Sequence, residues 1–336
     1  MGCALSLMFP FPAESPMSQP VTLEHIRTAE ARIQGMIRRT PVLTSSTLDE
    51  RAGARLFFKC ENFQIAGAFK ARGAHNAVFA LSELEAASGV LTHSSGNHGA
   101  ALSLAARRRG IPAHIVVPEG ASAFKVEAIR RYGGRVIFCP PTLAEREAAA
   151  ARVQRETGAQ LIHPYDNPMI IAGQGTAALE LFEEVPDLQA VIAPVGGGGL
   201  LSGTAIASKG VNPSVRVFGA EPAGADDAAR SLHAGKFIPQ GDPRTVADGL
   251  RSSLGQITFP LLQQWVEDVI TVSEESIAEA MQLVWQVMKI VIEPSSAVAV
   301  AAVLKDAGTL RGLRVGVILS GGNVDLRRLP WPNTGS

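Results

Sequence analysis

Two patterns of apolar residues alternate along the chain. Short apolar runs, typical of buried strands, occur at 56–58, 89–93, 111–117, 135–139, 160–163, 190–195, 216–220 and 314–319. Longer segments with apolar residues at helical spacing occur at 23–37, 72–81, 100–109, 125–132, 144–157, 173–184, 200–209, 276–288 and 295–304. Because strands that alternate with helices form parallel βαβ units, the sequence predicts an α/β fold with helices on both faces of the sheet.

The composition narrows the class of protein. The 336 residues suggest about two domains, and a hydrophobic content of 46% with 18% charged residues supplies ample core. The net charge is zero, which argues against a general affinity for nucleic acid or for an anionic membrane. Cys3, Cys60 and Cys139 are too scattered for a disulfide framework or a metal cluster, so a cytoplasmic location is expected. Residues 1–20 contain four Pro and no Lys or Arg, and are predicted to be a disordered tail.

The first candidate chemistry lies just after the strand predicted at 56–58. Gly67 permits a sharp turn or a close backbone approach, and Lys70 lies between Phe69 and a predicted helix start. Burial and the positive end of a helix dipole both favour the neutral amine of a Lys, and a neutral amine can form a Schiff base. The alternative is an ordinary surface Lys that opens a helix. The chain has seven Lys, so few residues compete for the role.

Polar or glycine-rich turns follow two further predicted strands. One is Ser94-Ser95-Gly96-Asn97-His98-Gly99, where the free N–H groups of a helix N-terminus suit a substrate carboxylate. An ordinary capped turn is the alternative there. The other is Gly196-Gly197-Gly198-Gly199, whose backbone N–H groups can close around a phosphate. This run matches neither the dinucleotide fingerprint nor the Walker A loop, which indicates the phosphate of a smaller cofactor.

Two more turns complete the set. Glu221 and Asp227 lie in an acidic loop that could hold a hard cation such as Mg²⁺ or Ca²⁺, although such loops are commonly just solvated. Ser320 opens a Ser-Gly-Gly-Asn turn after the last predicted strand. In open α/β sheets ligands bind at the carboxyl ends of strands. We therefore expect these turns and Lys70 to share one site.

Together these motifs resemble the fold-type-II pyridoxal-phosphate enzymes, and within them the serine/threonine dehydratase and serine racemase branch. The resemblance runs from about 23 to 325 and rests on Gly-x-Phe-Lys-x-Arg-Gly-Ala, Ser-Ser-Gly-Asn-His, the four-Gly run and Ser-Gly-Gly-Asn. It implies two open, twisted, mostly parallel sheets with flanking helices. A large cofactor-binding domain would comprise 21–88 and 166–336, and a small inserted domain would comprise 89–165. Pyridoxal 5′-phosphate, a small amino-acid substrate and a homodimer are also implied.

The resemblance assigns a role to each candidate residue. Lys70 would be the Schiff-base lysine, Phe69 would lie against the cofactor ring, Asn97 would bond the ring hydroxyl and Ser320 would face the pyridine nitrogen. The phosphate would be held by Gly196, Gly197, Gly198, Gly199 and Leu200. The substrate carboxylate would be held by Ser94, Ser95, Asn97 and His98, with Arg146 at the mouth of the site. A divalent cation (Mg²⁺, Ca²⁺ or Mn²⁺) would be bound by Glu221, the carbonyl of Ala225, and Asp227.

The implied reaction is the dehydration of L-threonine, L-serine or a similar 3-hydroxy amino acid to a 2-oxo acid and ammonia, with the cofactor as electron sink. Lys70 would act as the base on one face of Cα, and Ser95 on the opposite face would add racemisation to elimination. A neutral Ser at the pyridine nitrogen favours prompt loss of the β-hydroxyl over a long-lived carbanion. Allosteric control of the kind seen in biosynthetic threonine deaminase is not expected.

Several residues depart from the usual pattern of the family. Ala68 replaces a common Ser, and Tyr165-Asp166 replaces a smaller amide, which makes the chain look closer to bacterial 3-hydroxyaspartate dehydratases. Such an enzyme needs a cation for the second carboxylate of its substrate. The candidates for this cation are Arg146, His75 and His163. The remaining alternatives are a serine racemase, a β-replacement synthase such as a cysteine synthase, and a non-catalytic binding protein that keeps the fold.

Overall fold

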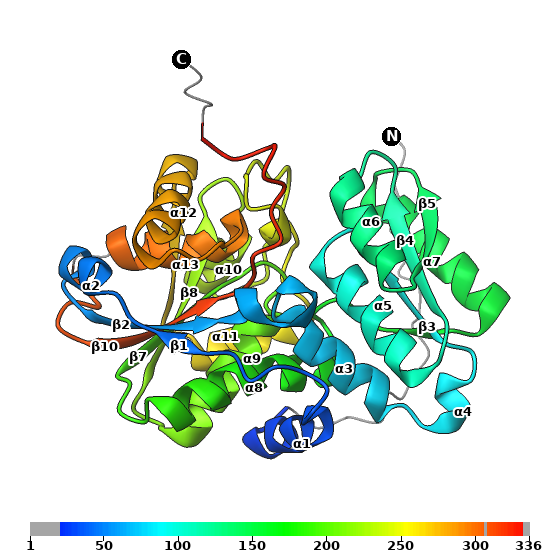
Figure 1. The fold of residues 1–336 in the computed structure, drawn as a ribbon, viewed down its shortest axis with the longest axis horizontal. Coiled ribbons are helices and arrows are strands. Elements are labelled where there is room, and N and C mark those ends of the chain that lie inside the picture. The colour runs from blue at the N-terminus through cyan, green and yellow to red at the C-terminus, as the bar shows by residue number, and fades with distance from the viewer. Residues whose placement is uncertain (1–20, 306–307, 332–336) are drawn as a thin grey trace, which may run out of the picture.

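The computed structural model describes residues 21–305 and 308–331, which form two sheets with helices on their faces (Figure 1). The predicted disordered tail, 1–20, lies outside the described residues. The two sheets and their flanking helices confirm the predicted α/β fold class. None of the helices in the described ranges has the length and apolar character that a membrane crossing requires.

The larger sheet has six strands in the order β1-β2-β10-β7-β8-β9. All neighbours are parallel except β1 and β2. Its strands are β1 (Val42–Leu43), β2 (Arg55–Cys60), β7 (Ala190–Pro194), β8 (Arg216–Pro222), β9 (Asp268–Val272) and β10 (Arg314–Leu319). β7 is buried at every residue, as expected for a central parallel strand that is covered on both faces.

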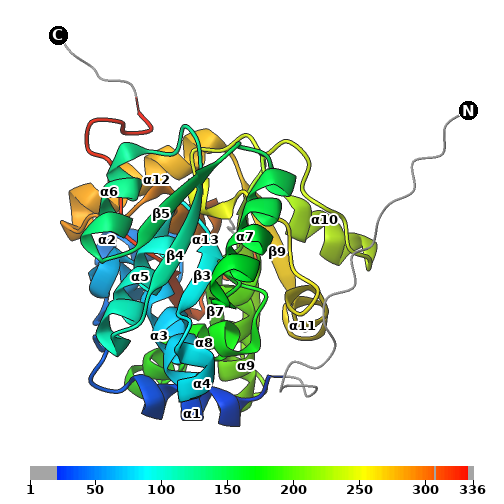
Figure 2. The same ribbon diagram turned by 90° about the vertical axis from the view of Figure 1, so that its right-hand side faces the viewer.

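The smaller sheet has four parallel strands in the order β5-β4-β3-β6. They are β3 (Val90–His93), β4 (Ala113–Pro118), β5 (Arg135–Cys139) and β6 (Gln160–Leu161). Side chains alternate between the two faces, so Ile115 and Val117 pack under α5 and α6 whereas Val116 packs under α7 (Figure 2). All four strands come from within the predicted small domain, 89–165, whose exact boundaries stay a prediction.

Helices cover both faces of the larger sheet. One hydrophobic core joins it to α2, α12 and α13, and a second core joins its other face to α1, α8, α9 and α11 (Figure 1). The helices of this part are α1 (Leu23–Ile33), α2 (Ser46–Ala52), α8 (Pro168–Glu184), α9 (Gly199–Val211), α10 (Asp227–Ala234), α11 (Thr258–Trp265), α12 (Glu274–Met288) and α13 (Pro294–Lys305). The others are α3 (Lys70–Ala80), α4 (Glu83–Ala86), α5 (Asn97–Arg109), α6 (Ala123–Arg131) and α7 (Leu143–Thr157), with short 3₁₀ turns η1 (Glu61–Phe63), η2 (Ile65–Gly67) and η3 (Asp248–Leu250).

The sequence placed most elements correctly but missed several boundaries. α1 ends at Ile33 rather than at residue 37, because the chain turns through Gly35 with φ +75°. α3 and α5 begin two and three residues earlier than predicted, so Lys70 and Asn97 are each the first residue of a helix. Apolar periodicity cannot detect the polar first turn of a helix. For the same reason it did not reveal α2, α4 or α10.

Candidate active site

Lys70 lies where the chain turns from the larger sheet into α3. Its Nζ donates a hydrogen bond to the Pro164 carbonyl at 2.8 Å and lies 5.1 Å from the centre of the Phe69 ring. Burial lowers the pKa of Lys70 to about 8. A substantial fraction of this amine is therefore neutral near physiological pH, which is the form that a nucleophile or a base requires.

Ser320 is adjacent to this lysine although 250 residues separate them in the chain. The Phe69 amide donates to the Ser320 carbonyl at 2.9 Å, and Ala68 and Gly321 form an isolated β-bridge. Gly67 makes this approach possible: its φ is +74°, and a Cβ there would lie 2.3 Å from Oδ1 of Asn323. The sharp turn and close approach predicted for Gly67 are therefore both present.

Asn97 is held in a chain of three polar side chains. Its Nδ2 donates to Oε1 of Glu293 at 2.8 Å, and its Oδ1 accepts from Nδ2 of Asn323 at 3.0 Å. The amide of Asn97 therefore has a fixed orientation. Glu293 is 4% exposed, and its Oε2 has no hydrogen-bond partner among the described residues. Burial raises the pKa of Glu293 to about 7, so this carboxyl carries a proton for much of the time at neutral pH.

The glycine run joins the end of β7 to the start of α9. Gly198 has φ +88°, and the backbone N–H groups from Gly196 to Leu201 find no acceptor among the described residues. Those at the start of α9 belong to the first turn of a helix, whose N–H groups have no intrahelical partner. A free row of donors at a helix N-terminus is an anion-binding site.

Tyr165 closes the other side of this glycine run. A Cβ on Gly197 would lie 2.3 Å from Cγ of Tyr165, so only glycine allows the ring to pack there. Since the preceding residue, Pro164, accepts the hydrogen bond from Lys70, the lysine and the glycine run lie on either side of one short segment. Burial raises the pKa of Tyr165 to about 12, and this phenol is therefore neutral.

Asp166 ties the same segment to α11. Its carboxylate accepts hydrogen bonds from the backbone amides of Gln256, Ile257 and Thr258 at 2.9, 2.9 and 3.2 Å. The Thr258 hydroxyl then donates to the carbonyl of Gly197 at 2.8 Å. The residue that departs from the common amide thus supports the glycine run from behind, because a carboxylate can accept several N–H bonds at a helix start.

The turn 94–99 connects β3 to α5. A Cβ on Gly99 would lie 2.3 Å from the carbonyl oxygen of Ser94, which keeps the turn tight. Ser94 and Ser95 are partly exposed immediately before the first turn of α5. His98 lies inward instead: it is 2% exposed, its Nε2 is 3.3 Å from the Ile162 carbonyl, and burial lowers its pKa well below the ordinary value. The predicted carboxylate site therefore contains a neutral imidazole and no cation.

Three residues were candidates for the cation that a dicarboxylic substrate would need, and the structure separates them. His75 is fully buried with Nδ1 2.7 Å from the Ala71 carbonyl, and burial lowers its pKa to about 4, so His75 was a wrong candidate. Burial lowers the pKa of His163 to about 3, and its Nδ1 accepts the Asp166 amide, so this ring is neutral too. Arg146 remains. Its Nε is buried without a hydrogen-bond partner among the described residues, and its charge, after burial, also lowers the pKa of the partly buried His93.

The predicted cation ligands lie directly behind the glycine run. Glu221 ends β8 and accepts the amides of Ala228 and Ala229, whereas Asp227 accepts the amide of Leu254 at 3.2 Å. Burial raises the pKa of Glu221 to about 9 and that of Asp227 to about 6, and Oδ1 of Asp227 has no partner in the described part of the chain. No cluster of three or more His, Cys, Asp or Glu side chains occurs in residues 21–305 and 308–331. The Ala225 carbonyl and water would have to complete this site.

A buried ionic network anchors the helix that begins at Lys70. Arg72 donates to Glu61 through two bonds of 2.7 Å and to Glu180 through bonds of 2.7 and 2.8 Å. Lys59 donates to the same Glu180 at 2.6 Å. Lys59, Arg72 and Glu61 are fully buried, so their charges are compensated only by one another and by Glu180. This network fixes α3 against β2 and α8 two residues after the candidate lysine.

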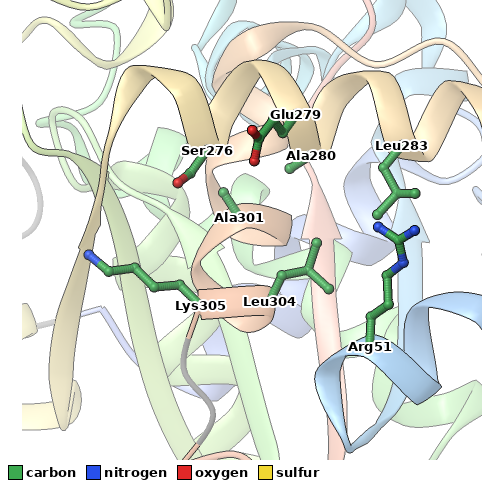
Figure 3. Close-up of a pocket in the computed structure, with 8 residues that line it drawn as sticks. All are labelled: Arg51, Ser276, Glu279, Ala280, Leu283, Ala301, Leu304 and Lys305. Atoms are coloured by element: carbon green, nitrogen blue, oxygen red, sulfur yellow. The ribbon is translucent and has the colours of Figure 1, made fainter.

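A surface groove lies elsewhere, between α2, α12 and α13 (Figure 3). It is lined by Arg51, Ser276, Glu279, Ala280, Leu283, Ala301, Leu304 and Lys305. None of the predicted site residues lines it, and the Lys305 ammonium already donates to the Thr271 carbonyl at 2.9 Å. We therefore place the candidate active site where Lys70, Ser320, Asn97 and the glycine run meet.

The residues at this place fit pyridoxal phosphate. The free N–H groups of the glycine run suit its phosphate, the partly neutral amine of Lys70 suits its aldehyde, and Ser320 lies beside Lys70. The fixed amide of Asn97 supplies a further polar group. The sequence missed Glu293, because an acidic residue before a helix is ordinary and only the contact with Asn97 reveals it.

Comparison with known proteins agrees with this fit. The family model described as "Pyridoxal-phosphate dependent enzyme" matches residues 33–321. A serine racemase of Oryza sativa subsp. indica is 50% identical over 309 residues, 90% of this chain and 91% of that protein. A β-hydroxyaspartate dehydratase of Paracoccus denitrificans is 52% identical over 310 residues, 92% of this chain and 98% of that protein.

Solved structures show the same relationship. The structure of maize serine racemase has a TM-score of 0.91 and 49% identity, with 92% of this chain and 95% of that chain covered. A threonine deaminase from the bacterium abbreviated "T.th." has a TM-score of 0.87 and 44% identity, with 91% and 99% covered. These findings confirm the resemblance, the fold class and the cofactor that the sequence predicted. The chain belongs to the pyridoxal-phosphate-dependent enzymes of fold type II.

Proposed function

We propose that this enzyme dehydrates a 3-hydroxy amino acid to a 2-oxo acid and ammonia. The observation that carries the proposal is the buried amine of Lys70, with its pKa near 8, beside Ser320 and the glycine run. The identity of 52% to a β-hydroxyaspartate dehydratase supports it. The relationship to a threonine deaminase and to serine racemases indicates the same class of substrate.

Lys70, Asn97, Ser320 and the run from Gly196 to Leu200 would hold the cofactor. When bound, pyridoxal phosphate withdraws electrons from the bonds at the substrate Cα. The free N–H groups at the start of α5, with the hydroxyls of Ser94 and Ser95, would bind the substrate carboxylate. Neutral His98 beneath the turn would leave the recognition of this carboxylate to hydrogen bonds and the helix dipole.

Proton transfer falls to two side chains. The neutral amine of Lys70 removes the proton from Cα, for which a pKa near 8 is suitable at physiological pH. The Ser95 hydroxyl would exchange a proton on the opposite face, which makes serine racemisation a second activity of the same site. Ser320 has no charge, so it would stabilise a positive pyridine nitrogen less than a carboxylate would, and this favours elimination.

A second carboxylate on the substrate is the specific feature that favours 3-hydroxyaspartate. Arg146 is the one charged residue left among the three candidate cations, and its Nε has no partner in the described structure. A guanidinium that is partly desolvated binds a carboxylate through paired hydrogen bonds. We therefore infer that Arg146 selects a dicarboxylic substrate, for which oxaloacetate would be the product.

The remaining parts of the proposal concern the cation and the assembly. Glu221, the Ala225 carbonyl and Asp227 would bind Mg²⁺, Ca²⁺ or Mn²⁺, and the two raised carboxyl pKa values are what burial without a cation produces. The contact between Leu254 and Gly198 would pass the order of this site to the glycine run. A homodimer and a cytoplasmic location are proposed from the resemblance alone.

The test is the release of 2-oxo acid from L-serine, D-serine, L-threonine and the 3-hydroxyaspartate isomers, with Mg²⁺ and with a chelator. Oxaloacetate formed far faster than pyruvate or 2-oxobutyrate supports the dicarboxylic substrate. Arg146→Gln should then raise KM for 3-hydroxyaspartate more than for serine. No oxo acid from any of these substrates would refute the dehydratase proposal.

Two variants control for the assigned chemistry. Lys70→Ala should abolish turnover and the absorbance band of the covalently held cofactor, and turnover that survives would sink the assignment of the base. Ser95→Ala should remove racemisation of serine while elimination from the L-isomer continues. If racemisation persisted in this variant, the acid–base residue on the second face would have to lie elsewhere.

A further inference from the structure

An ion pair joins the two sheet-bearing parts of the molecule close to the candidate active site. Lys125 lies in α6, which packs on the smaller sheet, and Asp248 opens η3, which follows β8 of the larger one. The ammonium of Lys125 pairs directly with the carboxylate of Asp248. The Lys125 side chain is only 17% exposed and that of Asp248 is 44% exposed. Screening by solvent is therefore weaker than for a pair on an open surface.

The Lys125 end of this pair is attached to the turn that would bind the substrate carboxylate. Ile129 lies one helical turn after Lys125 on the same face of α6. Its Cδ1 lies 3.2 Å from the position that a Cβ of Gly99 would occupy. Gly99 stands in the first turn of α5, directly after the turn that begins at Ser94. A displacement of Lys125 along or across α6 is therefore transmitted to the start of α5.

The Asp248 end is attached to the elements that would hold the cofactor. The amide of the next residue, Gly249, donates to Oγ of Ser295 at 3.0 Å. Cα of Leu250 lies 2.9 Å from the position that a Cβ of Gly196 would occupy, so η3 packs directly on the glycine run. η3 and the first residue of the phosphate site thus form one rigid contact.

Glu293 marks the place where these two ends approach the site. Burial is the largest influence on its pKa and raises it, but the charge of Lys125 lowers this pKa and that of Asp248 raises it. Both charges therefore act on a carboxyl that also accepts the amide of Asn97. The ion pair lies beside the polar chain of the site and not on a remote surface.

We propose that the Lys125–Asp248 ion pair positions the carboxylate-binding turn of the smaller part opposite the cofactor site of the larger part. Neither residue touches the reacting atoms, so both are positioning residues for the dehydration proposed above, on which this inference rests. An amino acid bound by its carboxylate to one part and by its amine to the other needs both parts at a fixed separation. Without the pair, substrate binding must supply the free energy of that arrangement, which weakens apparent affinity and leaves the chemistry intact.

The experiment compares Lys125→Glu, Asp248→Lys and the double charge swap in the cofactor-loaded enzyme. Each single variant should raise KM by about 3- to 10-fold, the range for losing a partly screened pair and gaining repulsion, and should leave kcat within about twofold. The double swap should restore KM to within about twofold of the wild type. Arg130→Glu is the matched control, because it makes the same charge change at an exposed position of α6 and should leave KM unchanged.

Salt supplies a second readout that a loss of folding would not produce. KM of the wild type should rise with NaCl, whereas KM of Lys125→Met/Asp248→Asn should be high and independent of NaCl. The dissociation constant of L-serine, followed through the absorbance of the bound cofactor, reports the same effect without turnover. Failure of the dehydratase proposal would thus appear as missing oxo acid with these binding differences intact. Single swaps that leave both constants unchanged, or a double swap whose defects simply add, would overturn the positioning role.

Discussion

Glu293→Gln should make the stability of the cofactor-free protein less sensitive to pH. Glu293 is 4% exposed, and burial raises its pKa from 4.5 to about 7. A carboxyl whose pKa is raised on folding stabilises the folded state through its neutral form. That contribution is complete below pH 4.5 and is lost as the pH rises through 7. The Gln side chain keeps an oxygen for the Asn97 amide and never becomes charged.

The magnitude follows from the pKa. A value of about 7 in place of 4.5, at about 1.4 kcal/mol per pH unit, corresponds to a loss of roughly 3 kcal/mol between pH 4.5 and pH 8. Urea unfolding of both proteins at pH 5, 6, 7 and 8 measures it, because other buried carboxyls such as Glu221 contribute equally to both and cancel in the difference. The variant should gain on the wild type by a few kcal/mol over this range.

Glu293→Ala is the control for the hydrogen bond. It also lacks the titrating group, so its stability should follow the pH profile of the Gln variant. It should lie below the Gln variant by about 1–3 kcal/mol at every pH, because Nδ2 of Asn97 loses its acceptor. Parallel curves for wild type and Glu293→Gln would mean that the carboxyl is ionised throughout, and would refute the neutral, proton-bearing Glu293.

Three further outcomes follow from the same site. Recombination of pyridoxal phosphate with the cofactor-free protein should accelerate about tenfold per pH unit and level off above pH 8, because burial gives Lys70 a pKa of about 8; a flat stopped-flow profile would contradict this. Mg²⁺ or Ca²⁺ at 100 times its dissociation constant should stabilise the wild type by about 2.7 kcal/mol, and Asp227→Asn should abolish the shift in Tm; an equal shift in that variant would exclude the site. Arg72→Met should cost about 3–5 kcal/mol in urea unfolding, because it leaves the buried Glu61 uncompensated. Adding Glu61→Gln should recover part of that loss, and a cost below about 1 kcal/mol for the single variant would show that the network is not needed.

The sequence by itself determined the architecture and the cofactor. Alternating short apolar runs and helical spacing predict parallel βαβ units, and ten strands in two mostly parallel sheets are present in the described residues. The motifs around Lys70, Gly196 and Ser320 were recognisable because each follows a strand, and strand ends of a parallel sheet lie on one edge. Glycine at 67 and 198 could be interpreted locally, since both have positive φ.

Only the tertiary structure decided which polar groups act together. Arg146 and His75 were equal candidates in the sequence, yet burial neutralises His75 whereas the Nε of Arg146 is without a partner among described residues. Glu293 and Asn97 lie 196 positions apart, and Lys125 and Asp248 lie 123 apart. Local patterns contain no information about such pairs, because desolvation and hydrogen bonding depend on neighbours that the fold brings from distant parts of the chain.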